Sequence, residues 1–391
     1  MMAPRMRFLR SSVRVSNSTS CSVSTIAGRP WGLFSFVVCG PSVAGSGVWA
    51  RAVTVAAIRK SSMGFILHPN VGSKALQWMF SPCHAVTTLT HAPTIWLLGD
   101  GKPGHENQSL GLTDAIGRIM PCEVHRLSIA GVKGFFRRMK ASNDASVGLP
   151  KPDLIIAAGH ATHPSLVKLA KKHGARSVVL MKPGLPMGWF DLCIVPEHDF
   201  PNGCNRGNVM LTRGALNRVV PPTTVTRESR MILIGGPSSS HGWDGKTLLD
   251  ALAEVSKEGH WQLTDSRRTP EGFVDEIRKR VPGIEIFPHQ QTTPEWLPGK
   301  LAAAEEAWAT EDSVSMVYET LSSGAKVGLL PAPRHEGTSR VLRGIEDLIS
   351  KGFLTPFADW QRRRVLTAPP ETLREADRCA RIVVDRLLKG S

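Results

Sequence analysis

Acidic residues are missing from the first quarter of this 391-residue chain, in which Asp100 is the first carboxylate. The first 99 residues hold nine of the 48 Lys and Arg residues and none of the 33 Asp and Glu residues. Much of the formal net charge of +15 therefore comes from this segment, and the rest of the chain is only mildly basic. A mildly basic surface suits an acidic small molecule or a membrane, and it does not require nucleic acid.

Cysteine pairs and tyrosine are scarce as well. None of the seven cysteines forms a C-x-x-C pair, which argues against a structural zinc site or a disulfide scaffold and fits a reducing compartment. The chain has one tyrosine and no RNP-type aromatic pattern, so we expect no nucleic-acid partner. These features indicate a cytoplasmic protein.

Residues 1–92 show no sustained hydrophobic period of either helix or strand. Their Arg- and Ser-rich, acid-free composition is typical of a mitochondrial transit peptide. Residues 30–50 are uncharged and long enough to span a membrane, but two prolines and four glycines interrupt them. The segment could also lie upstream of the true start, with Met63 as an internal start. We expect a poorly structured extension and leave these three origins open.

From about Thr94, apolar strand-like runs alternate with amphipathic helical stretches. The run 153–158 is almost wholly apolar, which is typical of a strand covered on both faces. In this half we predict strands over 94–98, 124–129, 153–158, 177–181, 191–195 and 209–212, and helices over 108–119 and 165–173.

Residues 221–224, Pro-Pro-Thr-Thr, interrupt the alternation and are predicted to be a linker. Beyond them we predict strands over 231–234, 261–264, 284–287, 308–310 and 327–330, and helices over 247–257, 271–280, 301–306, 315–322 and 371–388. The fold class is therefore α/β, with two doubly wound Rossmann-like domains, 93–222 and 223–391, facing across a cleft. In such sheets, ligands bind beyond the carboxyl ends of the strands.

The loop after the first predicted strand presents several polar groups at such an end. Its glycines, including Gly104, allow a ligand to approach the backbone, and the following helix start favours an anion. An imidazole can take a hydroxyl proton near neutral pH, so His105 is our candidate general base, with Asp100 or Glu106 as alternatives. We expect Lys102 and Gly104 to contact substrate.

The same loop formally matches the G-x-G-x-x-G fingerprint of dinucleotide-binding proteins. A ribose-binding acid belongs at the end of the second strand, whereas Glu123 begins that strand. The Tyr-x-x-x-Lys pair of sugar-epimerising reductases is also absent, since Ser322 follows Tyr318 at that spacing. We therefore expect no dinucleotide cofactor, and no other cofactor.

Two further loops of the first half follow predicted strands. His160 and His163 lie three residues apart, but no Asp, Glu or Cys stands beside them to complete a metal site. We expect no metal, and we place His160 in the lining of the cleft. Glu197 follows another strand and either binds the acceptor or belongs to a polar turn.

The second half repeats this arrangement three times. Gly235, Gly236 and Ser238 offer exposed amides and a hydroxyl that suit a phosphate, and Arg267 could reach a diphosphate. Ser313 and Ser315 stand at a helix start, where hydroxyls and amides can hold a diphosphate. Glu319 lies four residues after Ser315, on the same helix face, where its carboxylate could accept hydrogen bonds from a ribose. N-capping is the alternative role of the serines.

Six segments occur in an order that resembles the Elongated Mitochondria family of glycosyltransferases. They are DGKPGHENQSLGL, FDLCIVPEHD, NVMLTRGAL, GGPSSSHGWD, SRRTP and TEDSVSMVYE, and the resemblance covers about residues 94–360. The chain departs from the family pattern at 159–162 and 181–184, where the family usually carries an arginine in each place.

The resemblance implies a GT-B-like pair of Rossmann-type domains, with a nucleotide-diphosphate sugar held mainly by the second. Transfer without a metal ion to an acceptor at the first domain is the expected activity. The acceptor is unknown, and a lipid-linked or cell-envelope glycan is one candidate. Peripheral contact with the inner face of a membrane is a further expectation. The alternative is a non-catalytic, peripheral membrane adaptor of the mitochondrial-fission type, with a mitochondrial location.

Overall fold

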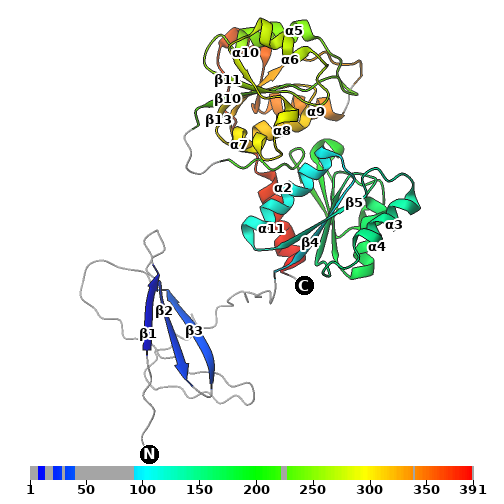
Figure 1. Cartoon of the computed structure of the whole chain (residues 1–391), viewed down its shortest axis with the longest axis vertical. Helices are drawn as coiled ribbons and strands as arrows, with labels where there is room; N and C mark the ends of the chain where they lie inside the picture. Colours follow the sequence, from blue (N-terminus) through cyan, green and yellow to red (C-terminus); the bar gives the residue numbers. More distant parts are fainter. Residues whose placement is uncertain are drawn as a thin grey trace, which may run out of the picture. The chain divides into compact units, whose positions relative to one another are not determined.

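The computed structural model describes residues 92–221, 227–337 and 340–389, together with the backbone of three strands nearer the N-terminus (Figure 1). Strands β1 (Phe8–Val13), β2 (Cys21–Gly28) and β3 (Trp31–Cys39) pair into an antiparallel sheet. Sequence periodicity predicts no strand in this segment. Met63 and most of the predicted linker lie outside the described residues.

The first α/β domain is built on a parallel sheet with the strand order β5-β4-β6-β7-β8-β9. The strands are β4 (Thr94–Gly99), β5 (Glu123–Ser128), β6 (Leu154–Ala158), β7 (Arg176–Leu180), β8 (Leu192–Pro196) and β9 (Val209–Thr212). The connecting helices are α2 (Pro103–Ile119), α3 (Phe135–Ala145) and α4 (His163–His173).

The second α/β domain is also built on a parallel sheet, with the order β12-β11-β10-β13-β14-β15. Its strands are β10 (Ser229–Leu233), β11 (Trp261–Thr264), β12 (Ile284–Ile286), β13 (Ala304–Thr310), β14 (Lys326–Leu330) and β15 (Leu354–Pro356). Its helices are α5 (Gly245–Val255), α6 (Phe273–Arg280), α7 (Trp296–Ala302), α8 (Val314–Ser323), α9 (Arg340–Ser350) and α10 (Phe357–Arg363). The predicted pair of doubly wound domains is confirmed.

Two predicted elements differ from the structure for identifiable reasons. Helix α2 begins at Pro103, five residues before the predicted start, because proline fits the first turn of a helix. The prediction of helix over 301–306 is wrong for its second half, since 304–306 open β13. This strand is paired on both sides, with β10 and β14, and such pairing overrides the helical preference of Ala and Glu.

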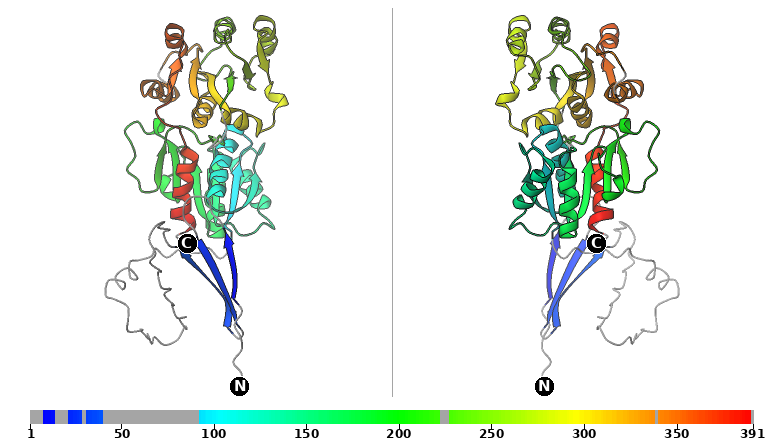
Figure 2. Two further views of the ribbon diagram at one scale, coloured as in Figure 1. Left: turned by 90° about the vertical axis from the view of Figure 1, so that its left-hand side faces the viewer. Right: turned by 90° about the vertical axis from the view of Figure 1, so that its right-hand side faces the viewer.

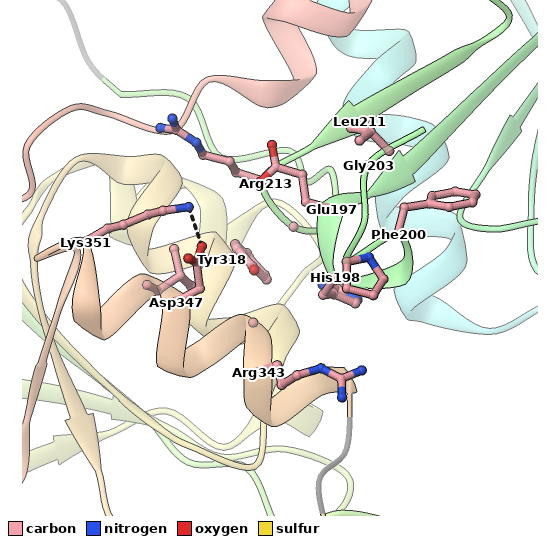
Figure 3. Close-up of a pocket in the computed structure, with 14 residues that line it drawn as sticks. Glu197, His198, Phe200, Gly203, Leu211, Arg213, Tyr318, Arg343, Asp347 and Lys351 are labelled. Atoms are coloured by element: carbon pink, nitrogen blue, oxygen red, sulfur yellow. Dashed lines mark hydrogen bonds and ion pairs between the residues drawn. The ribbon is translucent and has the colours of Figure 1, made fainter. Parts of the chain in front are cut away.

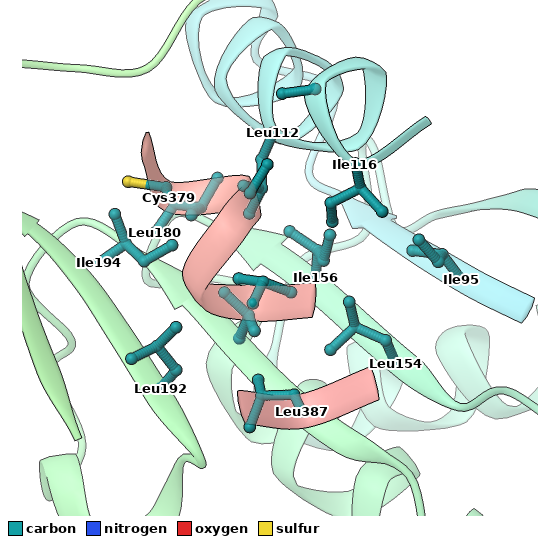
Figure 4. Close-up of a cluster of buried hydrophobic side chains, with 14 of the residues drawn as sticks. Ile95, Leu112, Ile116, Leu154, Ile156, Leu180, Leu192, Ile194, Cys379 and Leu387 are labelled. Carbon is teal, nitrogen blue, oxygen red and sulfur yellow. The ribbon is translucent and has the colours of Figure 1, made fainter. Parts of the chain in front are cut away.

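The C-terminal helix α11 (Glu375–Val383) packs against the first domain, although it follows the second in sequence. Figure 1 and Figure 2 show it beside α2. Its buried residues, continued through a π-helical turn to Leu388, join Leu112 and Ile116 of α2 over the apolar face of β4, β6 and β8 (Figure 4). The assignment of residues 371–388 to the second domain is therefore corrected for this helix. No helix in the described part of the chain is long and apolar enough to cross a membrane.

Candidate functional site

Both sheets have a point at which the direction of strand addition reverses. In the first sheet this point lies between β4 and β6, and in the second it lies between β10 and β13. Ligands of doubly wound proteins bind at such points, beyond the carboxyl ends of the strands. The polar loops after β4, β6, β10 and β13 are those in which the sequence predicts most of the site residues.

The loop after β4 holds an aspartate–histidine pair. Nδ1 of His105, in the first turn of α2, lies 3.0 Å from both carboxylate oxygens of Asp100. The Asp100 side chain is 6% exposed and that of His105 is 19% exposed, so the pair is shielded from solvent. A carboxylate at Nδ1 orients the ring and leaves Nε2 as the nitrogen that can exchange a proton with a ligand.

Gly159, at the end of β6, makes room for this pair. Its φ is +88°, and a Cβ there would come within 2.3 Å of the imidazole Nδ1 of His105. Only glycine fits both the backbone conformation and the close approach. The departure of the adjacent loop from the family pattern therefore lies directly beside the aspartate–histidine pair.

The other predicted residues of the loop after β4, Lys102, Gly104 and Glu106, are more exposed than the aspartate–histidine pair. The amide of Lys102 donates to Asp100 across 3.2 Å, and its side chain is exposed. Glu106 is exposed beside the backbone of Gly99. A Cβ on Gly104 would meet no atom within 4 Å, so nothing in the surrounding structure requires a glycine there.

His160 and His163 lie close to His105 but differ in burial. His160 is exposed, whereas His163 is 2% exposed, and the centroids of their rings are 5.2 Å apart. Burial, followed by the nearby charges of His160 and His105, lowers the pKa of His163 to about 4. Nδ1 of His163 accepts the amide of Gly184, so His163 acts as a neutral support for the loop. No group of three or more His, Cys, Asp or Glu residues able to hold a metal occurs in the part of the chain that the structure describes.

The glycines after β10 differ from the prediction in one respect. We expect exposed amides at Gly235 and Gly236, but both residues are buried and their amides already have acceptors. The amide of Gly235 donates to the hydroxyl of Thr310, and that of Gly236 donates to the carboxylate of Asp312. The prediction of exposed amides is therefore wrong, because side chains at the end of β13 and in the turn after it accept from them.

Asp312 and Arg268 tie three loops of the second domain together. The Asp312 side chain is 2% exposed and pairs with Arg268 at 2.8 Å, while Arg268 also donates to the carbonyl of Gly236. Arg267, the predicted diphosphate ligand, is exposed and its side chain is not used in this network. The hydroxyl of Ser238 accepts the amide of His241 and so shapes the turn after β10.

Residues that sequence reasoning missed stiffen the same edge. Glu311 is 7% exposed and pairs with Arg334, which follows β14 and also reaches Glu346. His241 is fully buried beside them, and this burial lowers its pKa. Acidic residues at the end of a strand are visible in the sequence, but their partners come from distant loops.

Helix α8 and its N-cap carry the remaining predicted residues of the second domain. Ser313 is its N-cap but makes no side-chain capping hydrogen bond, and Ser315 is exposed in the first turn. Glu319 lies one turn further and accepts a 2.6 Å hydrogen bond from the amide of Asn107 on α2 of the first domain. Burial raises the pKa of Glu319 to about 7, against the opposing effect of that hydrogen bond.

A pocket of about 400 Å³ lies between residues of both domains near the ends of β8 and β9 (Figure 3). Glu197 contributes to it from the first domain, and Tyr318 and Asp347 contribute from α8 and α9. The other predicted site residues do not line this pocket. Gly214 packs on Tyr318, since a Cβ at its φ of +81° would lie 2.1 Å from the ring. Glu197 is thus grouped with an interdomain pocket and not with His105.

Comparison with solved structures supports the GT-B-like architecture. A structure assigned as a UDP-N-acetylglucosamine 2-epimerase from Listeria monocytogenes matches with a TM-score of 0.51 and 11% identity, covering 76% of this chain and 98% of that one. The spinosyn forosaminyltransferase SpnP matches with a TM-score of 0.48 and 14% identity, over 77% of this chain and all of that one. At 11% identity the likeness to the Listeria structure concerns the fold alone.

Comparison of sequences is more specific. The Mitochondrial fission protein ELM1 of Arabidopsis thaliana is 23% identical in an alignment that covers 67% of this chain and 87% of the plant protein. Residues 103–387, nearly all of both α/β domains and α11, match the family described as Mitochondrial fission ELM1. The chain therefore belongs to the Mitochondrial fission ELM1 family.

Proposed function

We propose that this protein is a glycosyltransferase that transfers a sugar from a nucleotide-diphosphate sugar to a hydroxyl group of an acceptor. The observation that carries the proposal is the Asp100–His105 pair, held at 3.0 Å where strand addition reverses in the first sheet. A GT-B-like fold is a frame on which such chemistry occurs, and the pair adds a group able to perform it.

In the proposed reaction, Nε2 of His105 takes the proton of the acceptor hydroxyl as its oxygen attacks the anomeric carbon. The bond from that carbon to the diphosphate breaks, and its electron pair leaves with the diphosphate. Asp100 stabilises the imidazolium that forms, because its carboxylate already faces Nδ1. No metal ion takes part in this scheme.

The donor is assigned to the second domain. The first turn of α8, with Ser313 and Ser315, provides amides and hydroxyls for the leaving diphosphate, and Arg267 is exposed and available to pair with it. The carboxylate of Glu319 accepts hydrogen bonds from the ribose hydroxyls in place of the one from the side-chain amide of Asn107. Gly235, Gly236 and Ser238 shape the neighbouring loop rather than donate to phosphate.

The acceptor is assigned to the loops of the first domain. Lys102 and His160 expose cationic or polar side chains near His105, and Glu197 offers a carboxylate in the interdomain pocket. Carboxylates and imidazoles are common partners of sugar hydroxyls, which fits a glycan or a lipid-linked glycan as acceptor.

A ligand-stabilisation screen tests the proposal. The full chain is heated with a panel of nucleotide-diphosphate sugars that differ in base and sugar, and a bound donor raises the melting temperature by mass action. Donors that stabilise the protein are then tested for release of nucleoside diphosphate, with His105→Ala as the inactive control. Stabilisation without turnover under any acceptor condition would contradict the enzymatic reading.

The name of the family favours a second candidate. The plant relative is called a mitochondrial fission protein, so this chain could act as a peripheral adaptor without catalysis. An adaptor would need neither a donor nor the Asp100–His105 pair. If the protein is an adaptor, substitution of His105 would leave its cellular role intact. If the protein is a glycosyltransferase, the same substitution would abolish that role.

A further inference from the structure

Two phenylalanines at the start of α3 are presented to solvent. Phe136 is 83% exposed and Phe135 is 53% exposed, and their rings pack edge to face with centroids 5.2 Å apart. Gly134, with a φ of +93°, turns the chain just before them. Isolated exposed hydrophobic residues are ordinary, but two adjacent aromatic side chains at a helix start form a patch that water solvates poorly.

The surroundings of this patch are basic. No Asp or Glu occurs between Glu123 and Asp144, a stretch that contains five cations: Arg126, Lys133, Arg137, Arg138 and Lys140. Lys133 just before α3 and Arg137 and Lys140 on this helix are exposed. The next helix packs beside α3, since Lys172 of α4 donates to Asn143, and α4 adds exposed lysines of its own.

A small pocket of about 200 Å³ adjoins the patch. Phe135 and Arg138 line it from α3, and His160 and Ser165 line it from the loop after β6 and the first turn of α4. Ser165 is fully buried, and its hydroxyl has no hydrogen-bond partner in the described structure. An unpartnered hydroxyl, a guanidinium and the amide end of an eleven-residue helix suit a phosphate oxygen.

We propose that the start of α3 and this pocket form a docking surface for a membrane of anionic phospholipid. Phe135 and Phe136 insert at the level of the headgroups, where aromatic side chains are favoured. The exposed cations are attracted to the negative surface, and Arg138, His160 and Ser165 receive a lipid phosphate. The surface lies beside the loop after β6, so a docked protein would hold the edge that carries His105 close to the membrane.

Co-sedimentation of the full chain with vesicles tests this inference without any sugar donor. Binding is expected to vesicles of phosphatidylcholine with phosphatidylglycerol, to be weak on phosphatidylcholine alone, and to fall as salt rises. The double variant Arg137→Glu, Arg138→Glu should weaken binding by about thirtyfold or more. The double variant Phe135→Ser, Phe136→Ser should weaken it by about tenfold or more.

Matched substitutions elsewhere serve as controls. Val147→Ser removes a 75% exposed apolar side chain beyond the other end of α3, and Lys279→Glu reverses an exposed charge on α6. Both should bind vesicles as the unchanged protein does. Melting temperatures of all variants check that each is folded. Arg138 is half-buried and its Nε donates to the carbonyl of Val132, so the single variant Arg137→Glu, at an exposed position, tests the electrostatic attraction if the double variant unfolds.

Three outcomes would overturn the proposal. Equal binding of the unchanged protein and the Arg variant to anionic vesicles would show that electrostatic attraction at this surface does not drive binding. Binding of glycerol phosphate to the pocket, with no sedimentation of the protein on anionic vesicles, would make the pocket a site for free phosphate. A dimer that the Phe variant dissociates, again without vesicle binding, would assign the patch to a second copy of the chain. None of these results bears on donor binding, so the proposed transferase activity stands or falls separately.

Discussion

The carboxyl edges of the two sheets use polar residues in different ways. In the second domain the polar groups mostly satisfy one another, since Asp312 holds Gly236 and Arg268, and Glu311 holds Arg334. In the first domain, as far as the structure describes it, Asp100 engages Nδ1 of His105 and leaves Nε2 without a hydrogen bond. The second edge is thus a rigid frame, and the first edge carries a group that can move a proton.

This contrast fits the proposed reaction, in which the second domain binds the donor and the first supplies the general base. A donor site benefits from a frame fixed before the ligand arrives, because little ordering remains to oppose binding. A general base needs a group that can change its protonation state within hydrogen-bond reach of the substrate. The following substitutions separate a chemical role in the first domain from a framing role in the second.

The largest effect is expected at His105. His105→Ala should lower the turnover number for sugar transfer by about 10²- to 10⁴-fold, the usual contribution of a positioned general base. Donor affinity, measured by titration calorimetry, should stay unchanged because the donor is assigned to the other domain. His125→Ala is the matched control, since His125 also pairs with a carboxylate, Glu123, but lies on β5 away from the strand end.

The next effect is on stability. Asp312→Asn keeps the shape of the side chain and an oxygen that can accept from Gly236 and Arg268, but it removes the negative charge that pairs with the guanidinium of Arg268. Its free energy of unfolding, measured by denaturant titration, should fall by about 2–4 kcal/mol. Asp275→Asn removes an exposed ion pair with Arg278 on α6 and should cost less than about 1 kcal/mol. Similar losses in the two variants would contradict the view of Asp312 as a framing residue.

Most of the architecture could be predicted from the sequence because apolar runs and helical periods recur along the two domains. The run 154–158 is buried throughout, as its composition predicts. The position of α11 could not be predicted, since an amphipathic face does not specify the sheet it will cover. Asp100 and His105 are close in sequence, so their proximity could be predicted. The hydrogen bond from Asn107 to Glu319 could not, because it joins residues 212 positions apart.

A smaller effect is expected on donor affinity at Glu319. Glu319→Gln keeps one acceptor and the shape but removes the charge, and a hydrogen bond to a charged group contributes about 1.5–3 kcal/mol. At pH 8, above the raised pKa of Glu319, affinity for the nucleotide-sugar should therefore fall by about ten- to a hundredfold. Glu276→Gln on the exposed face of α6 should leave the affinity unchanged.

The same variant should alter the pH dependence of stability. Burial raises the pKa of Glu319 to about 7 from 4.5, so between these values the folded protein retains a proton that the unfolded chain releases. Stability must then fall as the pH rises through this window. Glu319→Gln removes this loss, and we expect it to exceed the unchanged protein by about 1–3 kcal/mol at pH 8 and to match it near pH 4. Parallel stability curves would show that the carboxylate is solvated.

The smallest effect is expected from removal of residues 1–91. The family match begins at residue 103, and both six-stranded sheets with their helices lie within 94–389. The two edges compared above therefore draw no residue from the N-terminal segment. A chain that starts at Ala92 should melt at the same temperature as the full chain and bind the same nucleotide-sugars. A clear drop in melting temperature, measured by calorimetry on both proteins, would show that the segment stabilises the α/β domains and would contradict its description as an extension outside the fold.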